Sequence, residues 1–280
     1  MSDLIQRLNG LCDEQPFHTG WYFKDLKSGQ TADRAGATVV PSASTRKIAI
    51  LMAALREVHR GRFSLDQPFT IEARYQNTTS GIFQHFTPGS SFPLRDALVG
   101  MIVVSDNTCT GKIADMIGLD VINEFSRSVG MVGTTHRHST PPGNLGFDHP
   151  VEATNATTPS DVGRLLELIL QGTQDASAAE KLGSTTELVQ LGLDILSWQK
   201  LNQRMPYLLP GGVKVAHKTG TGARNFNDAG LVFAGDEPRF ILTVYTDGVP
   251  ATLPDGRAGH SAADLLIAHL TRACWDALCA

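Results

Sequence analysis

The stretch Pro41-Ser-Ala-Ser-Thr-Arg-Lys-Ile-Ala-Ile-Leu51 places a serine, Ser44, three residues before a lysine, Lys47, at the start of an apolar run. The run reaches Arg60 and is apolar around most of its circumference, which predicts a central, buried helix from Ser44 to Arg60. On such a helix Lys47 lies one turn from Ser44 on the same face. A serine hydroxyl is a weak nucleophile until a neighbouring base accepts its proton. The pair is therefore a candidate nucleophile and base.

This spacing alone is a weak signal, because about one Ser-x-x-Lys is expected by chance in a chain of this length. A second copy, Ser197-Trp-Gln-Lys200, is interpreted as a solvated helix face. Taken in isolation, an N-cap serine followed by a solvent-reaching lysine explains Ser44 and Lys47 better than catalysis does. The chain also contains two rarer tripeptides, Ser105-Asp106-Asn107 and Lys218-Thr219-Gly220. Each occurs by chance in roughly 5% of such chains, so their presence together favours the catalytic interpretation.

The residue types of the two tripeptides fit one reaction. Ser105 suits a proton shuttle to a leaving group, and Asn107 can bond both the substrate and Lys47. Lys218 adds a positive charge that favours the neutral, basic form of Lys47. Thr219 offers a hydroxyl to a substrate carboxylate, and Gly220 permits close backbone approach. The alternative is structural: the first tripeptide also makes a good helix cap, and the second also suits a strand end.

Together these motifs resemble those of class A β-lactamases, which are penicillin-recognising serine hydrolases. Ser105 and Lys218 follow Ser44 by 61 and 174 residues, and the similarity extends through Asn227-Asp-Ala-Gly230. It implies an acyl-enzyme on Ser44, with the backbone N–H groups of Ser44 and Thr221 as the oxyanion hole. It also implies an α/β fold with a five-stranded antiparallel sheet, terminal helices and an all-helical lobe.

The sequence departs from the family at the glutamate that activates the deacylating water. Asn155-Ala-Thr-Thr-Pro159 resembles the end of the loop that carries it, but residues 134–151 contain no glutamate. Glu152 is the remaining candidate base, at the wrong spacing. Arg224 is a candidate anchor for a substrate carboxylate, although a surface arginine in a hairpin is almost as good an interpretation.

Hydrophobic periodicity places the elements along the chain. A helix is predicted over 2–13, strands over 21–23 and 37–40 around the turn at 27–29, and several helices over 93–133. A loop over 134–155 precedes helices over 157–170 and 184–202, strands over 213–217, 229–234 and 240–247, and a helix over 260–278. We predict one domain over 1–280, with an α/β subdomain (about 1–43 and 205–280) and a helical subdomain (about 44–204).

Bulk composition excludes some partners. The 280 residues carry a formal net charge of -4, with Lys and Arg scattered, which argues against nucleic-acid binding. No apolar run could cross a bilayer, and the first residues do not form a signal peptide, so a cytoplasmic location is expected unless a leader has been removed. The four cysteines are expected to be free thiols. No cofactor is expected, and the histidines at 136, 138 and 149 lack the spacing of a metal site. His217 should face away from Lys218, since side chains alternate along a strand.

Three functions stay open. The first is a serine hydrolase cleaving a small-molecule amide or lactam through an acyl-enzyme on Ser44. The second is an esterase, peptidase or glutaminase-like hydrolase with the same chemistry. The third is a noncatalytic binding homologue, against which the joint presence of a nucleophile and its base argues. The sequence leaves the natural substrate and the oligomeric state undetermined.

Overall fold

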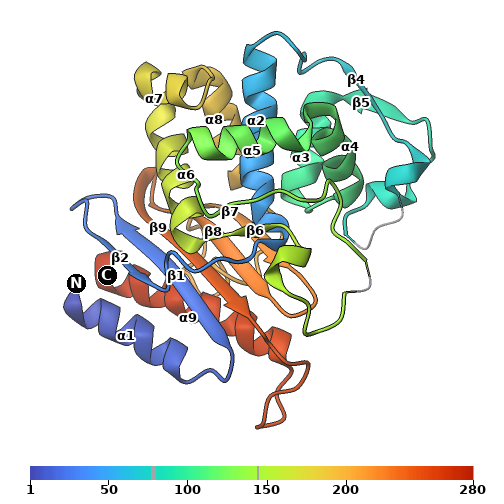
Figure 1. Ribbon diagram of the computed structural model, residues 1–280. Helices are drawn as coiled ribbons and strands as arrows, with labels where there is room; N and C mark the ends of the chain where they lie inside the picture. Colours follow the sequence, from blue (N-terminus) through green and yellow to red (C-terminus); the bar gives the residue numbers. More distant parts are fainter. Residues whose placement is uncertain (77–79, 144, 280) are drawn as a thin grey trace.

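The computed structural model describes residues 1–76, 80–143 and 145–279, and a five-stranded antiparallel sheet lies at its centre (Figure 1). The strand order β2-β1-β9-β8-β7 brings the first strands of the chain beside the last. The strands are β1 (His18–Asp25), β2 (Thr31–Arg34), β7 (Val215–Thr221), β8 (Phe226–Ala234) and β9 (Glu237–Asp247). Strands β8 and β9 are buried along almost their whole length because both faces of the sheet are covered.

One face of the sheet packs against the two terminal helices, α1 (Ser2–Asp13) and α9 (Gly259–Cys279). The helix at the N-terminus has the predicted bounds. Alternate residues of the strands point to this side, where Trp21, Phe23 and Leu242 contact apolar side chains of both helices. The two terminal helices thus cover one face of the sheet, and the helical layer covers the other.

The other face supports a helical layer built around α2 (Lys47–His59), which is buried from Lys47 to Glu57. The central, buried helix predicted from the apolar run is thus confirmed. Helix α6 begins as predicted, with Thr158 as its N-cap and Pro159 in its first turn. The remaining helices are α3 (Leu94–Val103), α4 (Asn107–Ile117), α5 (Leu119–Ser128), α6 (Pro159–Gly172), α7 (Ala176–Lys181) and α8 (Thr186–Ser197).

The strand predicted over 37–40 is wrong. The turn after β1 forms a tight hairpin in which Lys24 pairs with Thr31, so the partner strand is Thr31–Arg34. The chain then leaves the sheet at Ala35, whose φ is 51°. Val40–Pro41 forms β3, which pairs with β6 (Ala156–Thr157) in a separate two-stranded ladder. Two valines were therefore assigned to the wrong ladder, because period-two patterning does not identify a pairing partner.

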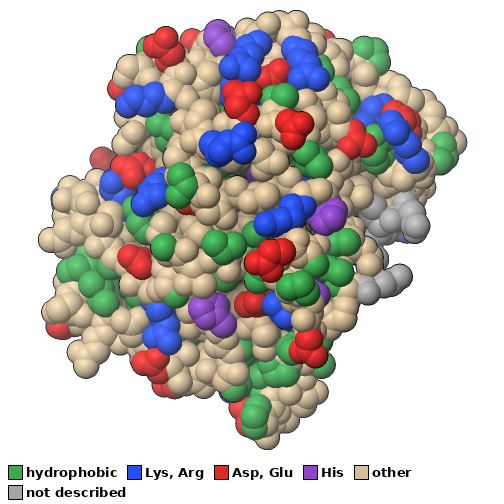
Figure 2. All heavy atoms as spheres, viewed as in Figure 1, with side chains coloured by type: hydrophobic (Ala, Val, Ile, Leu, Met, Phe, Trp, Pro, Cys, Tyr) green, Lys and Arg blue, Asp and Glu red, His purple; other side chains and the backbone are tan. Residues whose placement is uncertain are grey.

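Other bounds differ locally. Strand β7 continues to Thr221 rather than ending at His217, and α8 ends at Ser197 rather than near 202. Helix α7 and the short ladder of β4 (Pro68–Thr70) and β5 (Ser91–Pro93) were not predicted. On the face shown in Figure 2, Lys and Arg side chains lie among Asp and Glu side chains. None of the helices in the described ranges is long and apolar enough to span a bilayer.

Candidate active site

Ser44 lies where the sheet meets the helical layer, in the short 3₁₀ helix η1 (Ala43–Arg46) that precedes α2. The predicted helix thus begins with a 3₁₀ turn, in which side chains three residues apart eclipse, so Ser44 and Lys47 share a face. Ala43 has a φ of 43°, an uncommon value for a residue with a Cβ. Thr45 Oγ donates to the carbonyl of Ser42 at 2.6 Å, which fixes the turn.

Lys47 is buried and occupies the floor beneath the nucleophile. Its Nζ donates to the carbonyl oxygen of Ser105 at 2.7 Å and to Asn107 Oδ1 at 2.8 Å, and lies 3.1 Å from Ser105 Oγ. Burial, with the nearby positive charges of Lys218 and Arg46, lowers the pKa of Lys47 well below the usual value for lysine. The amine is thereby favoured in the neutral form that can accept a proton.

Ser105 and Asp106 lie in the predicted turn between α3 and α4, and Asn107 is the first residue of α4. Ser105 has a φ of 56°, which costs on the order of 1 kcal/mol for a residue other than glycine. Asp106 holds the turn in place, since its carboxylate accepts from the backbone N–H of Cys109 at 2.9 Å and of Phe83 at 2.8 Å. The strained turn directs both the carbonyl and the hydroxyl of Ser105 at Lys47.

Lys218, Thr219 and Gly220 lie on β7, at the edge of the sheet that faces η1. Lys218 is buried and donates to the carbonyl oxygen of Thr219 at 2.8 Å. Burial lowers the pKa of Lys218 to about 7, against the opposing effect of Asp228. A Cβ on Gly220 would lie 3.0 Å from the carbonyl oxygen of Ser42, so the absence of a side chain allows the strand to approach the nucleophile turn.

Arg204 is a buried residue that sequence reasoning missed. It binds behind the site, where Nη1 donates to the carbonyl oxygens of Gly220 and Asn227, both at 2.7 Å, and Nη2 donates to Thr221 Oγ at 2.7 Å. Asp264 on α9 receives the remaining Nε–H at 2.6 Å. An isolated arginine in an irregular segment gives no periodic or motif signal, so only the tertiary structure reveals this role.

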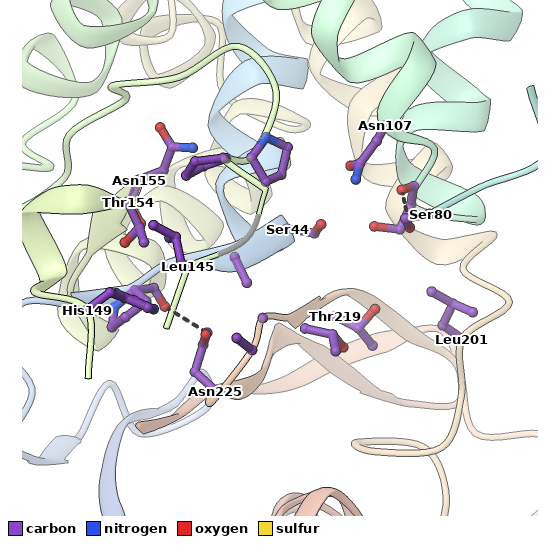
Figure 3. A pocket seen from close by; sticks show the side chains of 18 residues that line it. Ser44, Ser80, Asn107, Leu145, His149, Thr154, Asn155, Leu201, Thr219 and Asn225 are labelled. Atoms are coloured by element: carbon purple, nitrogen blue, oxygen red, sulfur yellow. Dashed lines mark hydrogen bonds between the residues drawn. The ribbon is translucent and has the colours of Figure 1, made fainter. Parts of the chain in front are cut away.

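Two asparagines of β8 and the loop before it fasten the nucleophile turn to the sheet. Asn227 Nδ2 donates to the carbonyl oxygen of Pro41 at 3.0 Å. Asn225, labelled in Figure 3, donates through Nδ2 to the same oxygen at 3.2 Å. Asn227 stood in the stretch that resembles the family, but no role followed from the sequence. Its function here is to fix the segment just before Ser44.

A cavity of about 470 Å³ opens over Ser44. In Figure 3, Ser80, Asn107 and Leu201 lie on one side of Ser44, and Leu145, His149, Thr154 and Asn155 lie on the other. Among the described residues, its lining is Pro41, Ala43, Ser44, Ser80, Ser105, Asn107, Pro141, Pro142, Leu145, His149, Thr154, Asn155, Leu201, Thr219, Thr221, Gly222, Ala223 and Asn225. Lys47 and Lys218 are buried beneath this surface.

The candidates Arg224 and Glu152 also lie outside the lining. Arg224 forms a two-bonded ion pair with Asp247, at 2.8 and 3.1 Å, and donates to the carbonyl oxygen of Phe147 at 2.7 Å. Its guanidinium is thus engaged by its own chain rather than presented to the cavity. Glu152 is exposed on the short helix η4 (Val151–Ala153), whereas Thr154 and Asn155 line the cavity.

The second Ser-x-x-Lys copy lies at the end of α8, where Ser197 Oγ donates to the carbonyl oxygen of Asp194 at 2.7 Å. This bond is a local cap and involves no lysine. His217 is buried, and its Nδ1 lies 2.9 Å from Asp228 Oδ1, away from the nucleophile. In the ranges that the structure describes, no group of three His, Cys, Asp or Glu side chains could hold a metal ion. The described cysteines are free thiols.

Known proteins resemble the chain over its full length. Residues 3–278 match the model of the family described as "Beta-lactamase enzyme family". A D-alanyl-D-alanine carboxypeptidase, DacB2 of Mycobacterium tuberculosis, is 29% identical over 231 residues, which cover 76% of this chain and 72% of the relative.

Solved structures share the fold. The β-lactamase of Sphaerobacter thermophilus has a TM-score of 0.83 at 24% identity, covering 99% of this chain and 97% of that one. The protein PBP-A has a TM-score of 0.82 at 27% identity, covering 99% and 96%. A mutant of PBP-A has been solved as an acyl-enzyme complex with penicillin G, with a TM-score of 0.81 at 26% identity and coverage of 99% and 96%. The five-stranded sheet and the helical layer therefore form a β-lactamase-like fold.

Proposed function

Because this chain belongs to the β-lactamase enzyme family, we propose that it is a serine hydrolase that forms an acyl-enzyme through Ser44. Family membership supports serine hydrolase activity acting on amide or lactam bonds in general. The observation that carries the finer assignment is the position of Lys47, whose Nζ is buried between Ser105 and Asn107 one turn from Ser44. A lysine without a catalytic task would be expected to extend to solvent.

Groups in the site can accept and return the proton that moves during acylation. Neutral Lys47 accepts the hydroxyl proton of Ser44 as Oγ attacks the substrate carbonyl carbon. The backbone N–H groups of Ser44 and Thr221, which both line the cavity, stabilise the oxyanion that forms. The proton then passes from Lys47 through Ser105 to the leaving nitrogen or oxygen, since Ser105 Oγ lies 3.1 Å from Lys47 Nζ. Collapse of the intermediate leaves an ester on Ser44.

The substrate is proposed to be a small amide, lactam or ester with a carboxylate on its leaving-group side. Lys218 supplies positive charge beneath the cavity floor, and Thr219 lines the cavity itself. Asn107 is proposed to bind the substrate while holding Lys47. Arg224 is not proposed as a carboxylate anchor, because Asp247 already neutralises it.

Deacylation is the weak step of the proposed cycle. Residues 134–151 contain no glutamate, and Glu152 is exposed outside the lining. Penicillins should therefore acylate Ser44 faster than the resulting acyl group is hydrolysed from it. Cleavage of an amide of the carboxypeptidase type is a second candidate, favoured by the similarity to DacB2 and by the same weak deacylation of lactams.

Covalent labelling tests the assignment. The purified chain is treated with a penicillin or with a serine-reactive phosphonate, and intact mass followed by peptide mapping locates the adduct. We expect one adduct on Ser44, none in Ser44→Ala, and full labelling of the matched variant Ser197→Ala. Labelling that survives Ser44→Ala would refute the proposed nucleophile.

A further inference from the structure

The end of the cavity formed by the loop after α5 contains an ionisable side chain, that of His149. Of the described residues that line the cavity, the others have aliphatic, hydroxyl or amide side chains, or none. At this end the neighbours of His149 are Leu145, Thr154 and Asn155 (Figure 3). Any selection by charge at this end therefore depends on His149.

The orientation of the imidazole leaves one nitrogen for a ligand. His149 Nδ1 lies 3.1 Å from the carbonyl oxygen of Pro150. A carbonyl oxygen only accepts hydrogen bonds, so Nδ1 carries the hydrogen, and Nε2 has no hydrogen-bond partner among the described residues. Nε2 is an acceptor when the ring is neutral and a donor bearing positive charge when it is protonated.

The loop that carries His149 is tied to the rest of the site. Arg224 Nη1 donates to the carbonyl oxygen of Phe147 at 2.7 Å, and its ion pair with Asp247 keeps the guanidinium in place. Arg137 Nη1 donates to the carbonyl oxygen of Thr154 at 2.9 Å. A ligand that binds at His149 therefore does not have to order a free loop, which would weaken its binding.

The charges around this end favour an anion. No carboxylate is among the described residues that line the cavity. Asp148 and Glu152 are exposed outside it. Of the cationic side chains nearby, Arg137 is bonded to the carbonyl oxygen of Thr154, Lys218 lies beneath the floor, and Arg224 is neutralised by Asp247.

The two ends of the cavity have different roles if Ser44 is the nucleophile. Ser105, which would return the proton to the leaving group, adjoins Asn107, on the side of Ser44 opposite His149. The acyl group then extends toward His149. We propose that His149 is a specificity-determining residue that selects acyl groups bearing a carboxylate. This inference rests on the proposed function, because the attack by Ser44 defines the acyl end.

Two penicillins that differ by one group test it. Carbenicillin carries a carboxylate on the acyl side chain, and benzylpenicillin lacks it. The ratio of their second-order acylation rate constants is measured at one pH in the unmodified chain and in variants. Both penicillins share the ring carboxylate proposed to face Lys218, so that contribution cancels in the ratio. We expect the ratio to be about two- to fivefold lower in His149→Gln than in the unmodified chain, the size of a partly exposed ion pair.

Two variants make the test specific. His149→Gln keeps a hydrogen-bonding side chain but cannot carry a positive charge, so its ratio should be the lower one. His269→Gln, an exposed position on α9, should behave as the unmodified chain does. Benzylpenicillin acylation in each variant confirms that the site is intact.

Three results overturn the inference. An unchanged ratio in His149→Gln would show that His149 does not select by charge, as would an equal fall in His269→Gln. A loss confined to the deacylation rate in His149→Gln would make the residue a base rather than a selector. Absence of any Ser44 adduct with both penicillins would refute the proposed function itself, a failure that intact mass detects before any ratio is measured.

Discussion

The Nζ atom of Lys47 lies 3.1 Å from Ser105 Oγ, although 58 residues separate the two along the chain. The contact joins α2 to the strained turn that precedes α4. In the proposed acylation step, this contact carries the proton from Lys47 on to the leaving-group side. The first prediction follows from this path.

Replacing Lys47 by Ala should lower the acylation rate at least about 100-fold, the usual contribution of a positioned base. Lys200→Ala, in the second copy of the motif, should leave the rate within about threefold. Stopped-flow acylation by a chromogenic cephalosporin measures both. Equal losses of acylation rate in the two variants would show that Lys47 is not the base.

Substitution of Gly220 by Ala should impair catalysis more than stability. The new Cβ would lie 3.0 Å from the carbonyl oxygen of Ser42 and 3.1 Å from Thr45 Cγ2, and so push β7 from the nucleophile turn. A displacement of this kind should slow acylation on the order of tenfold to 100-fold. Gly211→Ala, where nothing lies within 4 Å of the added Cβ, is the control. Comparable acylation rates in the two variants would show that the close approach of β7 to the nucleophile turn does not matter for acylation.

Acylation by carboxylate-bearing substrates should decline as the pH rises through about 7. Burial lowers the pKa of Lys218 to about 7, so its positive charge is present below that pH and lost above it. A neutral ester substrate should show no such decline. Rate constants for a penicillin and a neutral ester, measured from pH 6 to pH 9, separate the two cases. A parallel decline for both would assign the titration to the chemical step instead.

Stability should fall in mild acid because of His136. Burial, with the charge of Arg46, lowers the pKa of His136 to about 3, whereas an unfolded histidine titrates near about 6.5. Above about pH 6.5 neither state is protonated and stability is full. Below it the unfolded state alone binds the proton, and about 2 kcal/mol is lost between pH 7 and pH 5.

Urea unfolding at pH 7 and pH 5 measures that loss. His136→Gln cannot take up the proton and should lose correspondingly less. His269→Gln, on the exposed face of α9, should lose as much as the unmodified chain. If His136→Gln loses just as much, other groups must account for the acid sensitivity.

Local patterns determined most of what could be predicted from sequence. The helix over 2–13, the buried helix after Ser44 and the cap at Thr158 depend on residues a few positions apart, and each is found where it was expected. The features that were missed depend on distant partners. The hairpin excludes Val39 from the sheet, and Arg204 binds carbonyls of β7 and β8 that no spacing in the sequence connects to it. The contacts of Arg224 could not be predicted for the same reason, since Asp247 and Phe147 lie 23 and 77 residues away.

Deacylation is expected to limit turnover of penicillins. Release of the acyl group needs a water that some group deprotonates, and general-base assistance typically contributes about 10²- to 10⁴-fold. Residues 134–151 supply no glutamate, and prolines 141 and 142 line the cavity on that stretch instead. Benzylpenicillin should therefore give a stoichiometric burst, slow turnover and a persistent acyl-enzyme mass.

The variant Glu152→Gln distinguishes a shifted base from a missing one. Glu152 is exposed outside the lining, so its replacement should change neither the burst nor the steady-state rate by more than about twofold. Stopped-flow kinetics and intact mass on both proteins measure the two phases. The natural substrate would then deacylate through Lys47 or Ser105 acting on a water, which a smaller acyl group would leave room to bind. Rapid turnover of benzylpenicillin that collapses in Glu152→Gln would instead mean that the loop moves to bring this carboxylate to Ser44, and that the chain is an efficient β-lactamase with a displaced base.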